Sequence, residues 1–172
     1  MSKIKVGIVC GGKSSEHEIS CISAAGVLSA IDRDRFEPIL IGITKAGEWV
    51  LPPNDYPLSI SGEVLPEIKG DLPKTNISEL KVDLLFPVLH GPYGEDGTFQ
   101  GQCEMAGLKY VGSGVLASAA GMDKEFSKAL FIAAGLPVTS HVVITEDTWL
   151  SDPERTLEKV KALGSLPLFV KP

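Results

Sequence analysis

One imidazole and two carboxylates lie together in a glycine-rich stretch in the middle of the chain. His90 follows the apolar run 84–89, and Glu95 and Asp96 come a few residues later, before a helical pattern that starts at Thr98. In an open α/β sheet, ligands bind beyond the carboxyl ends of the strands, and the next helix offers free N–H groups to an anion. We therefore interpret the stretch as part of a ligand site. The alternative is a solvated turn, in which the glycines supply only backbone freedom.

A second loop, residues 11–16, follows the first apolar run and adds the carboxylate of Glu16. If the strands before the two loops are neighbours, Glu16 and His90 lie on the same edge of the sheet. A carboxylate there can hold an ammonium group, and an imidazole can bind or orient a carboxylate, so the pair suits a zwitterionic amino acid. The alternatives are that Glu16 only places favourable charge in the first turn of a helix and that His90 only bonds to nearby backbone.

Two lysines are candidates for binding phosphate. Lys171 ends the buried-type run 168–170, where a cation is out of place unless it faces a ligand. Lys124 falls in the first turn of a predicted helix, the unfavourable end for a cation, so an anion nearby would account for it. An ordinary exposed lysine is the alternative at position 124.

Residues 112–117 read Gly-Ser-Gly-Val-Leu-Ala and formally match the dinucleotide-binding pattern G-x-G-x-x-A. That fingerprint closes the first strand of its fold and is followed about 20 residues later by an acidic residue. Here the pattern follows the fourth predicted strand, and the region about 20 residues later, where the acidic residue should end a strand, is part of a predicted helix. The pattern therefore supports dinucleotide binding only weakly.

These candidate residues need a framework of strands and helices to position them. Hydrophobic runs predict strands at 4–10, 36–43, 82–89 and 109–111, and strand-like segments at 48–51, 138–145 and 168–171. Helices are predicted from a Ser15–Glu18 capping box to about 31, at 98–106, from 112–114 to 121, at 122–134, and from a proline-led cap at 151–154 to 164. The order predicts an α/β fold with a doubly wound, mainly parallel sheet. We expect one domain over 1–121, a second and incomplete one over 122–172, and a proline-rich surface excursion over 52–79.

Composition excludes several classes of function. The chain has 172 residues with 44% hydrophobic and 22% charged content, which is ordinary for a soluble domain. Its net charge of −6 disfavours a nucleic-acid partner or an anionic membrane surface. No apolar run is long enough to span a bilayer, and the apolar run nearest the N-terminus ends too early for a secretory signal. The three cysteines lack metal-type spacing and suggest buried thiols in a reducing compartment, so we expect a cytoplasmic protein.

Several motifs in this order resemble the N-terminal part of the D-alanine–D-alanine ligases, which are ATP-grasp enzymes of peptidoglycan precursor synthesis. The motifs are Gly-Gly-Lys-Ser-Ser-Glu-His-Glu-Ile-Ser (11–20), Leu-His-Gly-Pro-Tyr-Gly-Glu-Asp-Gly-Thr-Phe-Gln-Gly (89–101), Gly-Ser-Gly-Val-Leu-Ala-Ser-Ala (112–119), Met-Asp-Lys (122–124) and Phe-Val-Lys-Pro (169–172). The resemblance spans the whole chain, and residues 44–80 are its variable part.

The resemblance implies a Rossmann-like, pre-ATP-grasp substrate-binding domain followed by the start of an ATP-grasp central domain. The implied reaction joins two D-alanines through an acylphosphate formed at the expense of ATP. Glu16 and His90 would be the catalytic and substrate-binding residues, with Glu16 on the ammonium of the first D-alanine. Lys124 and Lys171 would contact ATP phosphates, and Glu95 would organise its loop. The family is dimeric through its N-terminal domain.

The resemblance also defines what this chain is expected to lack. The phosphate loop, the adenine-binding strands and the acidic Mg²⁺ ligands of the family follow the Val-Lys-Pro strand, so we expect a truncated form that is inactive alone and holds no metal site. A D-alanine–D-lactate or D-serine ligase remains open, because the residues that choose the second substrate lie mostly in the absent part. Two further alternatives are a dinucleotide-binding oxidoreductase module and a non-catalytic dimerisation unit.

Overall fold

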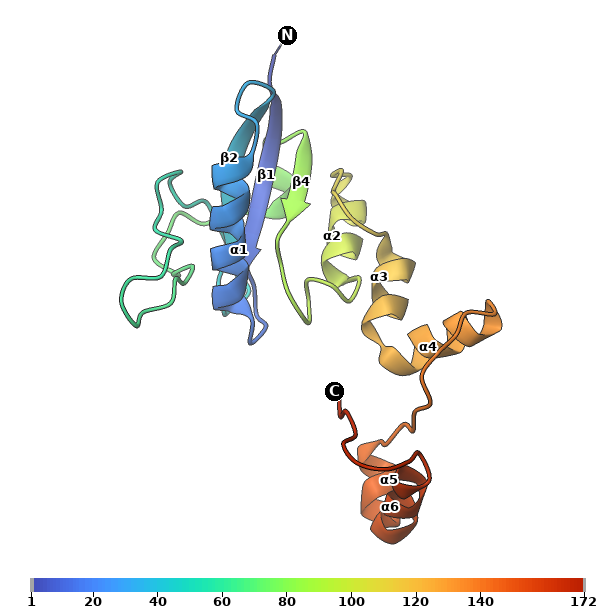
Figure 1. The fold of residues 1–172 in the computed structure, drawn as a ribbon. Coiled ribbons are helices and arrows are strands. Elements are labelled where there is room, and N and C mark those ends of the chain that lie inside the picture. Colours follow the sequence, from blue (N-terminus) through green and yellow to red (C-terminus); the bar gives the residue numbers. More distant parts are fainter. Residues whose placement is uncertain (1, 172) are drawn as a thin grey trace. The chain divides into compact units, whose positions relative to one another are not determined.

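The computed structural model describes residues 2–171, which form two compact units. Among the described residues, unit 1 comprises 2–123 and unit 2 comprises 124–171. Unit 1 contains the sheet, and unit 2 is built from helices and extended segments (Figure 1).

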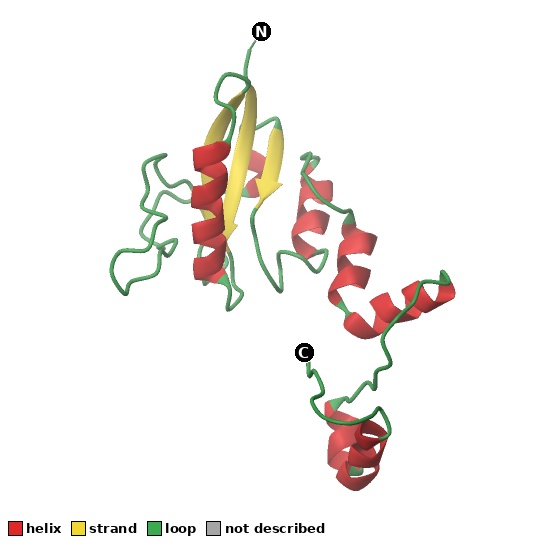
Figure 2. Cartoon of the chain, in the orientation of Figure 1, coloured by secondary structure: helices red, strands yellow, loops and turns green. Residues whose placement is uncertain are grey.

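Unit 1 is organised around a four-stranded sheet, which confirms the prediction of a mainly parallel α/β arrangement (Figure 2). Its strands are β1 (Ile4–Gly11), β2 (Phe36–Ile43), β3 (Trp49–Val50) and β4 (Leu84–Pro87), in the order β3-β2-β1-β4. β1 pairs in parallel with β2 and β4, and β3 adds antiparallel to the end of β2. The central strand β1 is therefore flanked on both sides, and the loops after β1 and β4 leave the same edge.

The side chains of β1 alternate between two hydrophobic clusters, as the pleat of a strand requires. Val6, Ile8 and Cys10 pack in the cluster that contains Cys21 and Ala24 of helix α1 (His17–Ala30). Val9 packs in the other cluster, with Phe99 and Cys103 of helix α2 (Thr98–Ala106). The two helices thus cover opposite faces of the sheet, and each directly follows one of the two loops.

The remaining helices are α3 (Val115–Met122), α4 (Lys124–Ala133), α5 (Glu146–Ser151) and α6 (Pro153–Lys161), with a short 3₁₀ turn η1 at Ile77–Glu79. The predicted bounds of α2 are those observed, and Pro153 is at the predicted first position of its helix. Helix α5 was not predicted. None of the helices among residues 2–171 combines the length and the apolar character needed to cross a membrane.

The predicted capping box at the start of α1 is wrong. The N-cap is Glu16, whose side chain makes no capping hydrogen bond, and the helix begins at His17. Glu18, which was expected to reach back to Ser15, instead pairs with Lys45 at 2.5 Å. An ion pair with a neighbouring loop has displaced the local capping interaction.

Two predicted strands, 138–145 and 168–171, are wrong, because the structure has extended backbone without strand pairing there. The predicted strand 109–111 is reduced to a single parallel bridge between Leu85 and Tyr110. β-branched composition marks a segment that fits a sheet, but a strand exists only where a neighbouring strand accepts and donates its hydrogen bonds.

The proline-rich segment 52–79 is more than the predicted surface excursion. Leu58 and Ile68 are buried in the cluster under α1. Gly42 makes room for this, since a Cβ atom there would lie 2.5 Å from Cγ2 of Ile68. The segment therefore completes the core on that face of the sheet.

Candidate functional site

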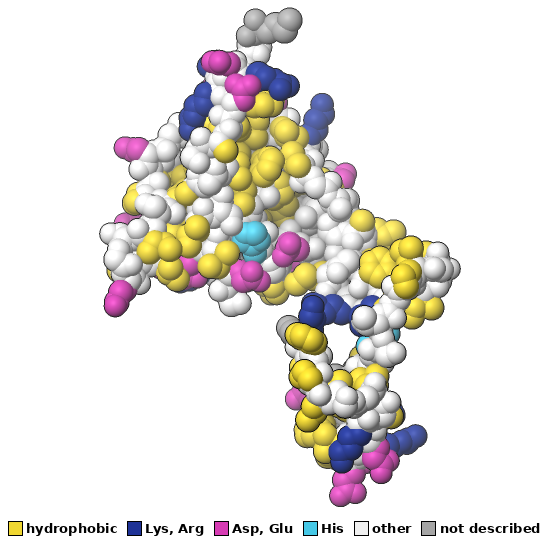
Figure 3. Space-filling model, viewed as in Figure 1, with side chains coloured by type: hydrophobic (Ala, Val, Ile, Leu, Met, Phe, Trp, Pro, Cys, Tyr) yellow, Lys and Arg dark blue, Asp and Glu magenta, His cyan; other side chains and the backbone are white. Residues whose placement is uncertain are grey.

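Two loops meet at the carboxyl edge of the sheet because β1 and β4 are parallel neighbours. The first, residues 11–16, joins β1 to α1, and the second, residues 88–97, joins β4 to α2. Figure 3 shows a histidine with acidic side chains beside it at this edge, where the strand arrows of Figure 1 end. This is where an open α/β sheet binds its ligands.

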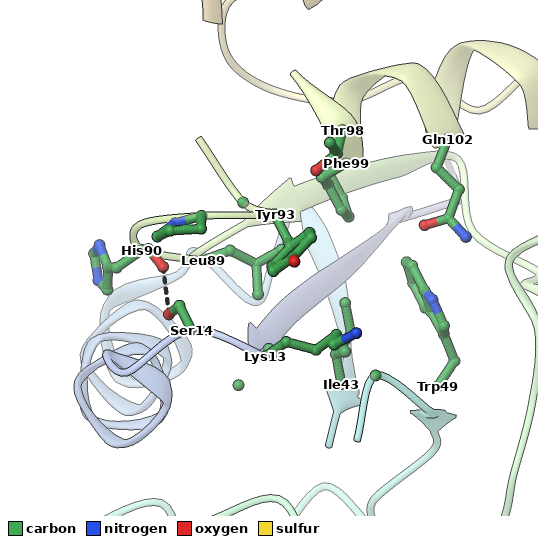
Figure 4. A pocket seen from close by; sticks show the side chains of 15 residues that line it. Lys13, Ser14, Ile43, Trp49, Leu89, His90, Tyr93, Thr98, Phe99 and Gln102 are labelled. Atoms are coloured by element: carbon green, nitrogen blue, oxygen red, sulfur yellow. Dashed lines mark hydrogen bonds between the residues drawn. The ribbon is translucent and has the colours of Figure 1, made fainter. Parts of the chain in front are cut away.

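Ser14 ties the two loops together. Its hydroxyl donates to the backbone carbonyl of His90 at 2.7 Å and accepts from the backbone N–H of Glu16 at 3.1 Å. The first of these bonds is drawn in Figure 4. One short side chain therefore fixes the backbone of both predicted ligand-binding residues.

Glu16 lies against Gly91, the residue after His90. A Cβ atom at Gly91 would come within 3.1 Å of Oε1 of Glu16, and Gly91 has a φ of 70°. Both the close approach and the left-handed backbone favour glycine at this position. The structure thus brings the two predicted residues to one edge, with the Glu16 carboxylate exposed there.

His90 is half-buried and held from the helix side. Its Nε2 lies 3.0 Å from Oγ of Ser23, a residue of α1. Among the hydrogen bonds of residues 2–171, none involves Nδ1 of His90. One ring nitrogen is therefore engaged by the fold and the other is available.

The acidic residues of the second loop hold the loop's own backbone. Glu95 accepts from the N–H of Gly91 at 2.7 Å, so it organises the loop. Asp96 accepts from the N–H of Tyr93 at 2.9 Å and from the N–H and hydroxyl of Thr98 at 3.0 and 2.6 Å. Partial burial works to raise the pKa of Asp96, but these hydrogen bonds outweigh it and lower the pKa. Tyr93 has a φ of 67°, a strained value for a residue with a side chain.

A cavity of about 220 Å³ opens between the two loops on the β3 side of the sheet. Trp49 and Phe99 stack along it with their ring centroids 6.2 Å apart. Lys13 and Tyr93 reach toward each other across it, with Nζ 5.2 Å from the ring centroid (Figure 4). This aromatic wall is not evident from the sequence, because Trp49 and Phe99 are far apart in the chain and only the fold brings them together.

Two buried polar residues of α1, neither of them predicted from the sequence, support this edge of the sheet from the core side. Ser20 accepts from the N–H of Gly11 at 2.9 Å and donates to the carbonyl of Val88 at 2.6 Å. His17 lies 2.7 Å from the carbonyl of Gly12 through Nδ1 and accepts the N–H of Ile68 at 3.0 Å through Nε2. Their place in the first turns of an amphipathic helix gave no signal of these distant partners.

The three cysteines are buried and unbridged, which confirms the prediction of buried thiols. Burial raises the pKa of Cys103 to about 11. A hydrogen bond with Cys21 and burial raise the pKa of Cys10 well above its usual value. Cys103 and Cys10 are therefore poor nucleophiles.

The two predicted phosphate-binding lysines both belong to unit 2. Lys124 is the first residue of α4, and Lys171 follows the extended segment 168–170. Both side chains are exposed, so their charge is accessible to an anion. Among residues 2–171, no group of three or more His, Cys, Asp or Glu side chains is placed to hold a metal ion.

The fold defines a class of protein: an α/β domain with a mainly parallel sheet, in which two loops meet at the carboxyl edge, the place where such sheets bind ligands. Residues 5–113 match the family model described as "D-ala D-ala ligase N-terminus". The match covers both loops, the strands β2, β3 and β4, and all of β1 except Ile4. The chain belongs to this family.

Curated relatives extend the similarity over nearly the whole chain. The D-alanine–D-alanine ligase of Mycolicibacterium gilvum is 48% identical over an alignment of 193 positions, gaps included. The alignment covers 99% of this chain and 51% of the relative. The D-alanine–D-alanine ligase of Arthrobacter sp. strain FB24 is 44% identical over an alignment of 191 positions, which covers 99% of this chain and 50% of the relative. The chain thus spans about half the length of the curated relatives it matches.

Solved structures agree. The D-alanine-D-alanine ligase from Coxiella burnetii has a TM-score of 0.73 at 31% identity and covers 92% of this chain and 49% of its own. The VanG D-Ala:D-Ser ligase from Enterococcus faecalis has a TM-score of 0.67 at 31% identity, and the match covers 94% of this chain and 49% of that one. The family match disfavours the alternative of a dinucleotide-binding module.

Proposed function

We propose that the protein acts as a D-alanine–D-alanine ligase in peptidoglycan precursor synthesis, with unit 1 as its first-substrate-binding domain. The observation that carries the proposal is the meeting of Glu16 and His90 at one sheet edge, across Gly91 and tied by Ser14. The identity of 44–48% to curated D-alanine–D-alanine ligases over 99% of the chain supports the same reaction.

In this proposal each edge residue has a distinct task. The exposed carboxylate of Glu16 holds the ammonium group of the first D-alanine, and His90 binds or orients its carboxylate. ATP, when bound, supplies the phosphoryl group that activates that carboxylate. The contribution of unit 1 is then positioning: it presents the carboxylate in a fixed orientation for in-line transfer.

Unit 2 is proposed to be the beginning of the ATP-grasp central domain. Lys124 and Lys171 carry exposed positive charge, which suits ATP phosphates, and we assign them that contact. ATP-linked Mg²⁺ belongs to the same proposal, but we assign it no ligand among residues 2–171, since none of their acidic clusters fits a metal. We further propose a cytoplasmic homodimer that associates through unit 1, as the family resemblance implies.

The second substrate is D-alanine in the preferred form of the proposal. D-serine is the alternative that a specific observation favours, because the VanG D-Ala:D-Ser ligase shares the fold at 31% identity. The pair at the edge serves the first D-alanine in either case, so unit 1 does not discriminate between them.

The experiment that tests the proposal is a titration of the protein with D-alanine, followed by the chemical shifts of Gly91 and His90. We expect binding of D-alanine in preference to L-alanine, and a loss of about 10- to 100-fold in affinity in Glu16→Gln, since the amide keeps an acceptor oxygen but lacks the negative charge that pairs with the ammonium group. Glu37→Gln is the matched control, because Glu37 is an exposed carboxylate near the opposite end of β2. Equal affinity in Glu16→Gln and the parent protein would remove Glu16 from its role.

A further inference from the structure

His90 is held at two points by residues of different elements. Ser14 bonds its backbone carbonyl at 2.7 Å, and Ser23 bonds its ring at Nε2 at 3.0 Å. Ser23 lies on α1, which is anchored in the core by the fully buried Cys21 and Ala24. The ring is thus fixed by a rigid helix as well as by its own loop.

The chemistry of a neutral imidazole links its two nitrogens. One nitrogen carries the proton and donates, while the other accepts. If Nε2 accepts from the Ser23 hydroxyl, Nδ1 must carry the proton. A carboxylate ligand has only acceptor oxygens, so a neutral His90 can bind it through Nδ1 only in that form.

We propose that Ser23 is a positioning residue that donates its hydroxyl proton to Nε2 of His90 and holds the ring in its Nδ1–H tautomer. Nδ1–H is then the donor offered to the carboxylate of the bound amino acid. The identity of the ligand and the choice of the Nδ1–H form rest on the proposed function, whereas the contact between Ser23 and Nε2 does not.

The protein contains its own reference for this tautomer. His17 is fully buried, with Nδ1 2.7 Å from the carbonyl of Gly12 and Nε2 accepting from the N–H of Ile68. Both partners are backbone groups with fixed roles, so His17 must be the Nδ1–H tautomer. His90 is expected to show the same pattern of ring-nitrogen shifts as His17.

The test is a two-bond ¹H–¹⁵N correlation spectrum of the ¹⁵N-labelled protein at a pH of about 8.5, above the usual titration range of histidine. The His90 signals are assigned by their loss in His90→Gln. We expect the Nδ1–H pattern in the parent protein and in Ser23→Thr, which keeps the hydroxyl, and a shift toward the Nε2–H pattern in Ser23→Ala. Ser29→Ala is the matched control, because Ser29 is exposed on the same helix and bonds only the carbonyl of Gly26.

Two results overturn the proposal. The first is an Nε2–H pattern for His90 in the parent protein, which needs no variant to fold. The second is an unchanged Nδ1–H pattern in Ser23→Ala.

A measurement of D-alanine affinity tests separately whether the Nδ1–H group of His90 binds the ligand. We expect Ser23→Ala to bind D-alanine about fivefold more weakly, the effect of one ordinary hydrogen bond, and Ser29→Ala to bind as the parent does. Unchanged affinity despite a changed tautomer would show that Nδ1–H does not meet the ligand. Absence of D-alanine binding to the parent protein would contradict the proposed function, and the tautomer result would still decide the role of Ser23.

Discussion

At the scale of single residues, Ser14 shows how one hydroxyl joins two segments that are 76 positions apart in sequence. Replacing it with alanine removes the bonds to the His90 carbonyl and the Glu16 N–H. We expect Ser14→Ala to lower the free energy of unfolding by about 1–2 kcal/mol and to weaken D-alanine binding as well. Urea denaturation and the D-alanine titration measure the two effects. Ser15→Ala, at an exposed neighbouring position, should change neither, and an equal response of the two variants would contradict the assignment.

Asp96 gives the second loop a defined dependence on pH. Because its pKa is lower in the folded protein than in the unfolded chain, its contribution to stability is complete above its unfolded pKa of about 3.9. The contribution is lost as the pH falls through the lower folded value. Asp96→Ala should lower the free energy of unfolding by about 1–3 kcal/mol at pH 7, and by less in acid as the pH falls through the folded pKa of Asp96. Denaturation midpoints across this range provide the measurement, with the exposed Asp55→Ala as control. A constant difference between parent and Asp96→Ala at every pH would refute the assignment.

At the scale of elements, the turn from β1 into α1 depends on a glycine. Gly11 has a φ of 89°, and a Cβ atom there would overlap the carbonyl oxygen of Ile43. Gly11→Ala is therefore expected to lower stability by about 2–3 kcal/mol or more. Gly26→Ala, in the exposed middle of α1 with open space around it, should raise stability by about 0.5–1 kcal/mol. Thermal melting of both variants gives opposite signs if the turn requires glycine, and the same sign if it does not.

A buried imidazole is one of the groups that attach segment 52–79 to the sheet edge. His17 bridges the carbonyl of Gly12 and the N–H of Ile68, and His17→Ala leaves both backbone groups without a partner beside a cavity. The expected loss is about 3–5 kcal/mol, together with faster hydrogen exchange at the Ile68 amide. NMR exchange rates report the amide directly. The exposed His141→Ala serves as the control, and continued protection of Ile68 in His17→Ala would show that the segment's other contacts hold it without the imidazole.

At the scale of the whole molecule, sequence could predict what depends on local pattern. The strand 36–43 and the helix 98–106 have the predicted bounds, since apolar periodicity and flanking glycines are local signals. The shared edge of Glu16 and His90 could be anticipated because parallel neighbouring strands end together. The roles of Ser23 and Ser14 could not, because each depends on a contact between segments 67 or more positions apart. The extended segments 138–145 and 168–171 were overpredicted for the same reason, as pairing depends on a partner strand.

The distribution of buried side chains predicts that the two units differ in stability. Both hydrophobic clusters lie within unit 1, whereas Thr156 is the only buried side chain among the described residues of unit 2. Protease cleavage needs local opening, and opening is easiest where few apolar side chains are buried. Limited trypsin digestion should therefore cut first within 124–172 and leave a persistent fragment close to 1–123, identified by mass.

The two tryptophans allow a check in solution, since each unit contains one. Trp49 is 9% exposed in the core, and Trp149 is 43% exposed. We expect Trp49, measured in Trp149→Phe, to report a cooperative transition, and Trp149, measured in Trp49→Phe, to respond at lower denaturant or with little change. The opposite outcome is that both tryptophans report the same, equally steep transition and that trypsin first cuts in β1 or β4. This result would show that the two units unfold together, with stability that comes from contacts outside their separate cores.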